Sequence, residues 1–301
     1  MGTSALKLRI DRIVMVIFYA IGLICASSII FIVAFILVKG LNPFIADYGD
    51  VPNASFLRFI SSTTWTTNNY GVLGIAINTL YLTFLAALIA TPISVLTALF
   101  IVRIAPKHLA SGMQLIVELL AAVPSIVFGL FGMGVINPMV KGLAALFGVQ
   151  TAGGISGLST VIVLIIMMLP TITMLSITSM RAVKPNQIHA SLALGATKAQ
   201  TDFKIVIGGA KSGIFAALTL GVGRALGEAT AVSMVCGNAM TGPNFNLFGT
   251  TRTLTSTMML GLHEASGMDY DIRFSVGIVL IVIILITNLA LGAVKRRLER
   301  I

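Results

Sequence analysis

Three ionisable side chains, Glu118, Arg224 and Glu228, lie inside stretches of the sequence that are otherwise apolar. Each would cost at least ~2.5 kcal/mol at the centre of a bilayer, so each should face the protein interior or water. Arg224 and Glu228 are four residues apart, a spacing that places them on one face of a helix. A guanidinium group presents a planar, permanently charged donor fork, which suits an oxyanion such as phosphate. We therefore expect a transient anion site at Arg224, with Glu228 preventing Arg224 from binding the anion too tightly. The alternative is that Arg224 and Glu228 form a structural ion pair between helices.

Glu118 shares its predicted helix face with small residues, which allow a second helix to approach closely. Pro124 lies beside this face, where it removes a backbone hydrogen bond and can expose a carbonyl group to a pathway. The spacing favours packing by this face over direct contact with a substrate, and Glu118 stays a candidate for the pathway. The small residues are Ala121, Ser125, Gly129 and Gly132.

The composition is that of a membrane protein. Of the 301 residues, 57% are apolar and only 10% are charged, and the mean hydropathy is +1.01, values that do not suit a water-exposed surface. The net charge of +10 does not indicate a nucleic-acid partner, because the basic residues punctuate apolar runs. The sequence predicts an all-α polytopic membrane protein with six transmembrane helices, at about residues 13–38, 72–102, 112–136, 158–180, 212–236 and 274–294.

The basic residues are distributed unevenly between the two sides that six spans define. Fourteen of the twenty fall on the side of both termini and of residues 181–210, five fall on the other side, and Arg224 lies within a span. By the positive-inside rule, both termini and the 181–210 segment face the cytoplasm. The first apolar run, of 26 residues, is too long for the apolar core of a signal peptide, so we expect it to stay as a helix in the cell membrane.

Two parts of the chain are expected. Residues 1–70 comprise the cytoplasmic tail, the first transmembrane helix and an extracytoplasmic loop, and residues 71–301 form the main transmembrane domain. His108, His189 and His263 are far apart in sequence and have no metal-ligand companion nearby. The sequence also lacks the Gly-x-x-x-x-Gly-Lys-[Ser/Thr] phosphate loop. It therefore predicts no enzyme, no metal site and no cofactor.

The polar segment at about residues 181–210 has a helical pattern of its own. Pro185 interrupts the chain before a short amphipathic stretch, Gly195 suits a left-handed helix C-terminus, and a second helical stretch follows. Connectors of about 30 residues with their own periodicity are uncommon unless they are functional.

Part of this segment, at about residues 185–210, resembles the EAA loop of ABC importer permeases. That pattern reads Glu-Ala-Ala, three residues, Gly, nine residues, Ile, one residue and Leu-Pro. His189-Ala190-Ser191 occupies the first slot, Gly195 the glycine, Ile205 the isoleucine and Ile207-Gly208 the last pair, with His, Ser and Gly replacing Glu, Ala and Pro. The resemblance implies that a helix containing His189, Ala190, Gly195 and Ala196 couples the chain to an ATP-hydrolysing subunit.

Residues 118–132 and 223–228 are similar to the phosphate-specific permeases PstC and PstA, and residues 232–238 favour the PstC type. The resemblance implies the architecture of a type I ABC importer permease that translocates inorganic phosphate. It also implies a PstA-like second permease subunit, two ATP-binding subunits and an extracytoplasmic phosphate-binding protein as partners, besides membrane lipid.

Other functions stay open at the level of sequence. An ABC permease for sulfate, molybdate or an amino acid would equally place an arginine in the membrane. In an ion-coupled secondary carrier, Glu118 and Glu228 would relay protons without an ATPase, but the inverted repeats of many such carriers are not evident. In an assembly subunit, the buried charges would only pair helices.

Overall fold

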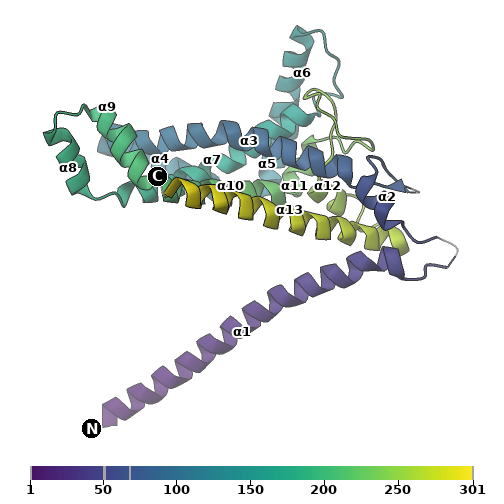
Figure 1. The fold of residues 1–301 in the computed structure, drawn as a ribbon, viewed down its shortest axis with the longest axis horizontal. Helices are drawn as coiled ribbons and strands as arrows, with labels where there is room; N and C mark the ends of the chain where they lie inside the picture. The colour runs from purple at the N-terminus through teal and green to yellow at the C-terminus, as the bar shows by residue number, and fades with distance from the viewer. Residues whose placement is uncertain (1, 50–51, 68, 300–301) are drawn as a thin grey trace.

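The computed structural model describes residues 2–49, 52–67 and 69–299, and it consists mainly of helices (Figure 1). The long helices are α1 (Gly2–Ile45), α3 (Leu73–Leu99), α7 (Gly157–Arg181), α10 (Ile207–Gly227) and α13 (Gly267–Glu299). The shorter helices are α2 (Phe56–Ser61), α4 (Lys107–Ala122), α5 (Ser125–Phe131), α6 (Asn137–Leu146), α8 (Pro185–Ala193), α9 (Lys198–Thr201), α11 (Thr230–Val235) and α12 (Leu254–Met259). Strands β1 (Trp65–Thr66) and β2 (Asn69–Tyr70) form an antiparallel hairpin, and π-helical turns occupy η1 (Phe100–Ile104), η2 (Gly132–Ile136) and η3 (Asp202–Val206).

Six helical segments of the described chain are long and apolar enough to cross a membrane. Their core is formed where α3, α7 and α10 pack together, with Leu82, Leu164 and Leu226 almost fully buried between them. Pro92 and Pro170 lie inside α3 and α7 without ending either helix, as is tolerated where neighbouring helices surround the freed backbone groups. The six candidate spans are residues 10–45, 73–104, 125–146, 157–181, 198–227 and 267–297.

The predicted boundaries of the third span are wrong. Residues 107–122 form a separate helix, α4, with no buried residue, and the span itself runs from Ser125 to Leu146 through α5, η2 and α6. The break lies at Val123, whose backbone is extended, because a residue before proline is pushed out of the helical region. Consequently, much of the stretch after residue 136 that was expected to be a loop is helical.

The bundle has two distinct ends. The Gly2 end of α1, the Glu299 end of α13 and the α8–α9 segment lie toward one end, here called the terminal end (Figure 1). The β-hairpin, α2, α12 and the Gly267 end of α13 lie toward the other, the hairpin end (Figure 1).

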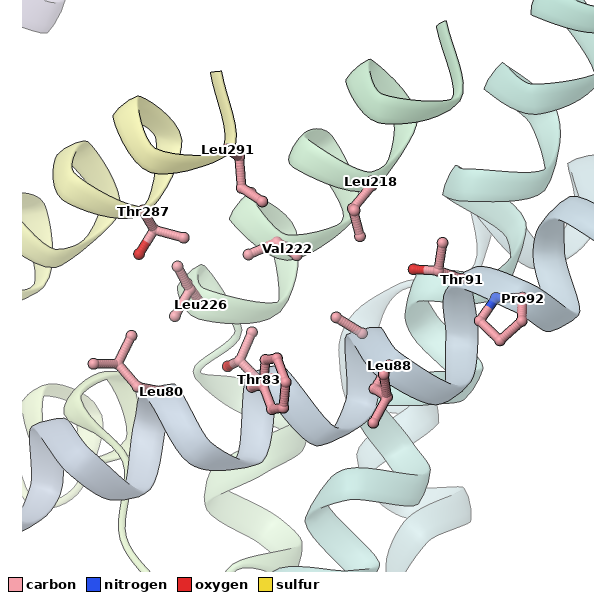
Figure 2. Close-up of a pocket in the computed structure, with 12 residues that line it drawn as sticks. Leu80, Thr83, Leu88, Thr91, Pro92, Leu218, Val222, Leu226, Thr287 and Leu291 are labelled. Atoms are coloured by element: carbon pink, nitrogen blue, oxygen red, sulfur yellow. The ribbon is translucent and has the colours of Figure 1, made fainter. Parts of the chain in front are cut away.

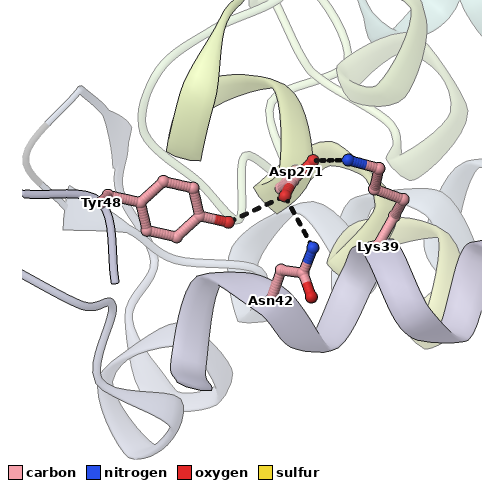
Figure 3. A network of polar contacts seen from close by, with 4 residues as sticks. All are labelled: Lys39, Asn42, Tyr48 and Asp271. Carbon is pink, nitrogen blue, oxygen red and sulfur yellow. Dashed lines mark hydrogen bonds and ion pairs between the residues drawn. The ribbon is translucent and has the colours of Figure 1, made fainter. Parts of the chain in front are cut away.

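Helices α1 and α13 are joined at the hairpin end and separate toward the terminal end (Figure 1). The buried carboxylate of Asp271 forms an ion pair with Lys39 at 3.4 Å and accepts hydrogen bonds from Asn42 and Tyr48 at 3.1 and 2.8 Å (Figure 3). Partial burial and the bond to Asp271 raise the pKa of Tyr48, so its hydroxyl stays a neutral donor at physiological pH.

Candidate functional site

The α8–α9 hairpin, residues 185–206, has the predicted helix–turn–helix form. Gly195 follows the end of α8 with φ of +84°, a conformation that favours glycine. Thr197 and Gln200 then form a reciprocal capping box that starts the second arm. The expectation of a short helix, a left-handed turn at Gly195 and a second helical stretch is confirmed.

The outer surface of this hairpin is exposed. His189 and Ala190 are exposed on α8, Ala196 is half-buried in the turn, and Leu194 is 89% exposed. The Ser191 and Thr201 hydroxyls, 2.9 Å apart, hold the two arms together. An apolar side chain presented at a rigid turn is suited to insertion into a partner protein.

The second arm of the hairpin continues into the membrane without interruption. Residues 198–227 form one helical segment of 30 residues, or about 45 Å at 1.5 Å per residue. Arg224 lies in the last turn of this segment. The exposed hairpin and the half-buried Arg224 therefore lie at opposite ends of one continuous helical segment.

An ion pair that the sequence analysis missed fixes this element at the terminal end. Asp202 is 7% exposed, and its carboxylate accepts a 2.7 Å hydrogen bond from Nε of Arg103 in η1. Around the pair, Ile177, Val206 and other buried apolar residues form a separate cluster. Arg103 follows the end of a predicted span and Asp202 lies in the polar 181–210 segment, and charges in both places usually face water, so the pattern gave no signal of their pairing.

Arg224 and Glu228 do not share a helix face, contrary to prediction. Helix α10 ends at Gly227, and Glu228 has an extended backbone with φ of −74° and ψ of 114°. The carboxylate of Glu228 accepts a 3.0 Å hydrogen bond from the backbone N–H of Ala231 in α11. The helix α10 therefore stops before Glu228, and the Glu228 side chain accepts a hydrogen bond from a free backbone N–H at the start of α11.

Arg224 is half-buried and its Nη1 donates to the Thr171 hydroxyl of α7 at 3.1 Å. Ion pairs form elsewhere in the described chain, between Lys39 and Asp271 and between Arg103 and Asp202. Arg224 therefore carries its charge inside a candidate membrane-spanning segment beside a neutral hydroxyl, and the alternative of an ion pair with Glu228 is not formed.

Glu118 lies away from this region. It is exposed on α4, where it accepts a 2.7 Å hydrogen bond from Gln114, whose own side chain accepts one from Arg181 of α7. The small-residue face predicted beside it is real in part, since Gly129 and Gly132 are buried against α11. Nothing in these contacts brings Glu118 to Arg224.

A groove on the described part of the chain is apolar. It has a volume of about 630 Å³ and lies between α3, α10 and α13, with Leu88, Val222 and Leu291 among its lining (Figure 2). Its polar groups are threonine hydroxyls, such as those of Thr83 and Thr287 (Figure 2). This lining suits lipid tails or another apolar helix and does not suit a charged anion.

The comparison with known proteins gives the family. A family described as "Binding-protein-dependent transport system inner membrane component" matches residues 90–300. The chain is a member of this family of permeases. It is 35% identical to the probable ABC transporter permease protein YqgH of Bacillus subtilis over 269 residues, which are 87% of this chain and 84% of the relative. It is 31% identical over 294 residues to the phosphate transport system permease protein PstC 2 of Mycobacterium tuberculosis, covering 91% and 88%.

Solved permease structures have the same fold. A bacterial alginate ABC transporter in complex with an alginate-bound periplasmic protein matches with a TM-score of 0.61 and 17% identity, covering 93% of this permease and 94% of that chain. The inward-facing MetNI methionine ABC transporter matches with a TM-score of 0.56 and 18% identity, covering 75% and 95%. The predicted all-α type I importer fold is confirmed. The chain is a multi-pass membrane transport subunit, of a family that works with ATP-binding subunits and a binding protein.

Proposed function

We propose that this permease is the PstC-like subunit of an ATP-driven importer of inorganic phosphate. The observation that carries the proposal is Arg224, a half-buried cation in a candidate membrane-spanning helix whose hydrogen-bond partner is the neutral hydroxyl of Thr171. Such a charge calls for an anion to neutralise it at some stage of the cycle, and guanidinium matches the geometry of a phosphate oxygen pair. The relatives named as PstC proteins support phosphate as that anion.

The proposed complex also contains a PstA-like second permease subunit, two ATP-binding subunits and an extracytoplasmic phosphate-binding protein. The terminal end faces the cytoplasm, in agreement with its excess of basic residues. The α8–α9 hairpin docks through His189, Ala190, Gly195 and Ala196 on an ATP-binding subunit.

ATP-driven closure of the two ATP-binding subunits then displaces the α8–α9 hairpin. The continuous helical segment from Lys198 to Gly227 transmits this motion to Arg224. The Arg103–Asp202 pair makes the η1 end of the second span move with it. Arg224 faces the extracytoplasmic side in one state and the cytoplasmic side in the other. In the proposed cycle Glu228, next to the end of α10, competes with phosphate for Arg224 and so promotes release; no role in the pathway is proposed for Glu118.

Competition between anions tests the substrate. Labelled phosphate uptake is measured in vesicles that hold the whole importer and ATP, with excess sulfate, molybdate or arsenate. The proposal predicts inhibition by arsenate, which shares the charge and shape of phosphate, and none by sulfate or molybdate. ATP-dependent uptake of another solute with none of phosphate would contradict the substrate and leave the fold unaffected.

A further inference from the structure

A cationic pocket lies at the hairpin end, and Arg224 is not among its lining. It has a volume of about 320 Å³ and is enclosed by the β-hairpin, by the loop after α11 and by the first turns of α13. Two arginines line it, Arg252 and Arg273, together with one acidic residue, Asp269, and with Thr67. With two positive charges and one negative charge, the pocket is net cationic.

Backbone pairing makes the walls of this pocket rigid. The N–H of Trp65 donates to the carbonyl of Met240 at 2.7 Å, and the N–H of Gly242 donates to Thr63 at 3.0 Å. On the other wall, the N–H of Ala239 donates to the carbonyl of Thr251 at 3.2 Å. The hairpin and the loop that holds Arg252 are therefore fixed relative to each other before any ligand arrives.

Arg252 is only 6% exposed, and its Nε and Nη2 donate to the carbonyl of Asn238 at 3.3 and 2.8 Å. Guanidinium has five N–H donors, so this contact uses a part of its capacity. Burial, the largest cause, and the nearby charge of Arg273 both lower the pKa of Arg252. Both effects oppose a cation at this position, and a bound anion would offset both.

Arg273 also has donors to spare. Its Nη1 donates to the carbonyl groups of Thr257 and Leu260 at the end of α12. Its Nε is buried and has no hydrogen-bond partner among the described residues. A buried donor without a partner is costly unless a ligand or water satisfies it.

We propose that this pocket is a second oxyanion site, which receives phosphate at the hairpin end before it reaches Arg224. The proposal rests on the proposed function for its choice of phosphate. Helix α12 links the two sites, because Arg252 precedes it, Leu260 follows it, and the hydroxyl of Thr255 in its first turn donates to the carbonyl of Glu228 at 2.7 Å. An anion bound by both arginines would therefore be connected through α12 to Glu228, the residue between α10 and α11.

The test is equilibrium binding of labelled phosphate to the assembled importer in nanodiscs, without the binding protein. It is made in an Arg224→Gln background, so that the bound phosphate reports the pocket alone. Arg252→Gln and Arg273→Gln are each expected to weaken this binding at least tenfold. Arg273→Lys, which keeps the charge and loses the fork, is expected to give an intermediate loss. Arg58→Gln removes an exposed arginine from α2 at the same end of the bundle and is expected to change nothing.

Equal phosphate binding in the four pocket and control variants would overturn the proposal, and so would a complete absence of phosphate binding in the Arg224→Gln background. A lipid headgroup carries the same chemistry, so the binding is measured in nanodiscs of phosphatidylcholine and of phosphatidylglycerol. Loss of phosphate binding in phosphatidylglycerol would assign the pocket to lipid and overturn the proposal. Because uptake by the unaltered importer is measured separately, the pocket and the proposed function can fail independently.

Discussion

At the scale of the residue, a charge in this protein is defined by what it contacts more than by where it stands in the sequence. Arg224 and Glu228 could be found from sequence because charges inside apolar runs are costly and rare. Their geometry could not, since nothing in the spacing shows that Glu228 accepts a hydrogen bond from Ala231 and that α10 stops before it. Arg252 and Arg273 were missed as site residues because loop and span-end arginines usually face water.

The Arg103–Asp202 pair gives a prediction at this scale. Arg103→Gln leaves a nearly buried carboxylate without its cation, and we expect a loss of about 2 kcal/mol, between the values for exposed and for fully buried pairs. Thermal unfolding of the purified importer measures it. The charge-swapped double variant Arg103→Asp with Asp202→Arg should recover part of the loss, whereas equal destabilisation by the single and double variants would show that the pair contributes nothing.

At the scale of the element, the amphipathic pattern and the glycine of residues 185–210 predicted the α8–α9 hairpin well, because both signals are local. The third span was misplaced because apolar residues continue on both sides of Pro124. Pro92 and Pro170 are tolerated within α3 and α7, whose neighbours surround them, whereas α4 has no buried residue to hold it in line with α5. Whether a proline bends a helix or ends it is decided by tertiary packing, which the sequence does not display.

The turn of the hairpin carries the second prediction. No atom lies within 4 Å of a Cβ added at Gly195, so a substitution there acts through the left-handed backbone alone. Gly195→Val should cost about 1–2 kcal/mol in this conformation and should lower the phosphate taken up per ATP hydrolysed. Gly195→Asn is the control, because asparagine tolerates the left-handed region. Unchanged coupling in the valine variant would contradict the role given to this turn.

At the scale of the whole molecule, α1 stands apart from the rest of the bundle except where it meets α13 (Figure 1). Most of its apolar side chains between residues 13 and 33 are exposed, so lipid or another chain must cover them. Hydropathy predicted that the chain has six spans, although it misplaced the third. It could not predict that one helix diverges from the others, because a membrane span is apolar on every side whether it packs against protein or lipid.

Asp271 is the polar centre of the joint between α1 and α13 (Figure 3). We expect Asp271→Asn to lower the free energy of unfolding by about 2–3 kcal/mol, because it removes an ion pair and two hydrogen bonds to a charged acceptor. Thermal unfolding in detergent measures this, with Glu264→Gln, an exposed carboxylate at the same end, as the control. Equal stability of the two variants would mean that apolar packing alone holds the joint.

The central claim, that ATP drives phosphate past Arg224, is tested most directly by uptake of labelled phosphate into vesicles that hold the complete importer. The unaltered importer should take up phosphate when ATP reaches the ATP-binding subunits and not when only a proton gradient is imposed. Arg224→Gln should lower that uptake about 10- to 100-fold, as expected for loss of charged hydrogen bonds to the substrate, while Thr171→Val, which keeps the charge, should be affected much less. Uptake driven by the proton gradient without ATP, or full uptake by Arg224→Gln, would contradict the account.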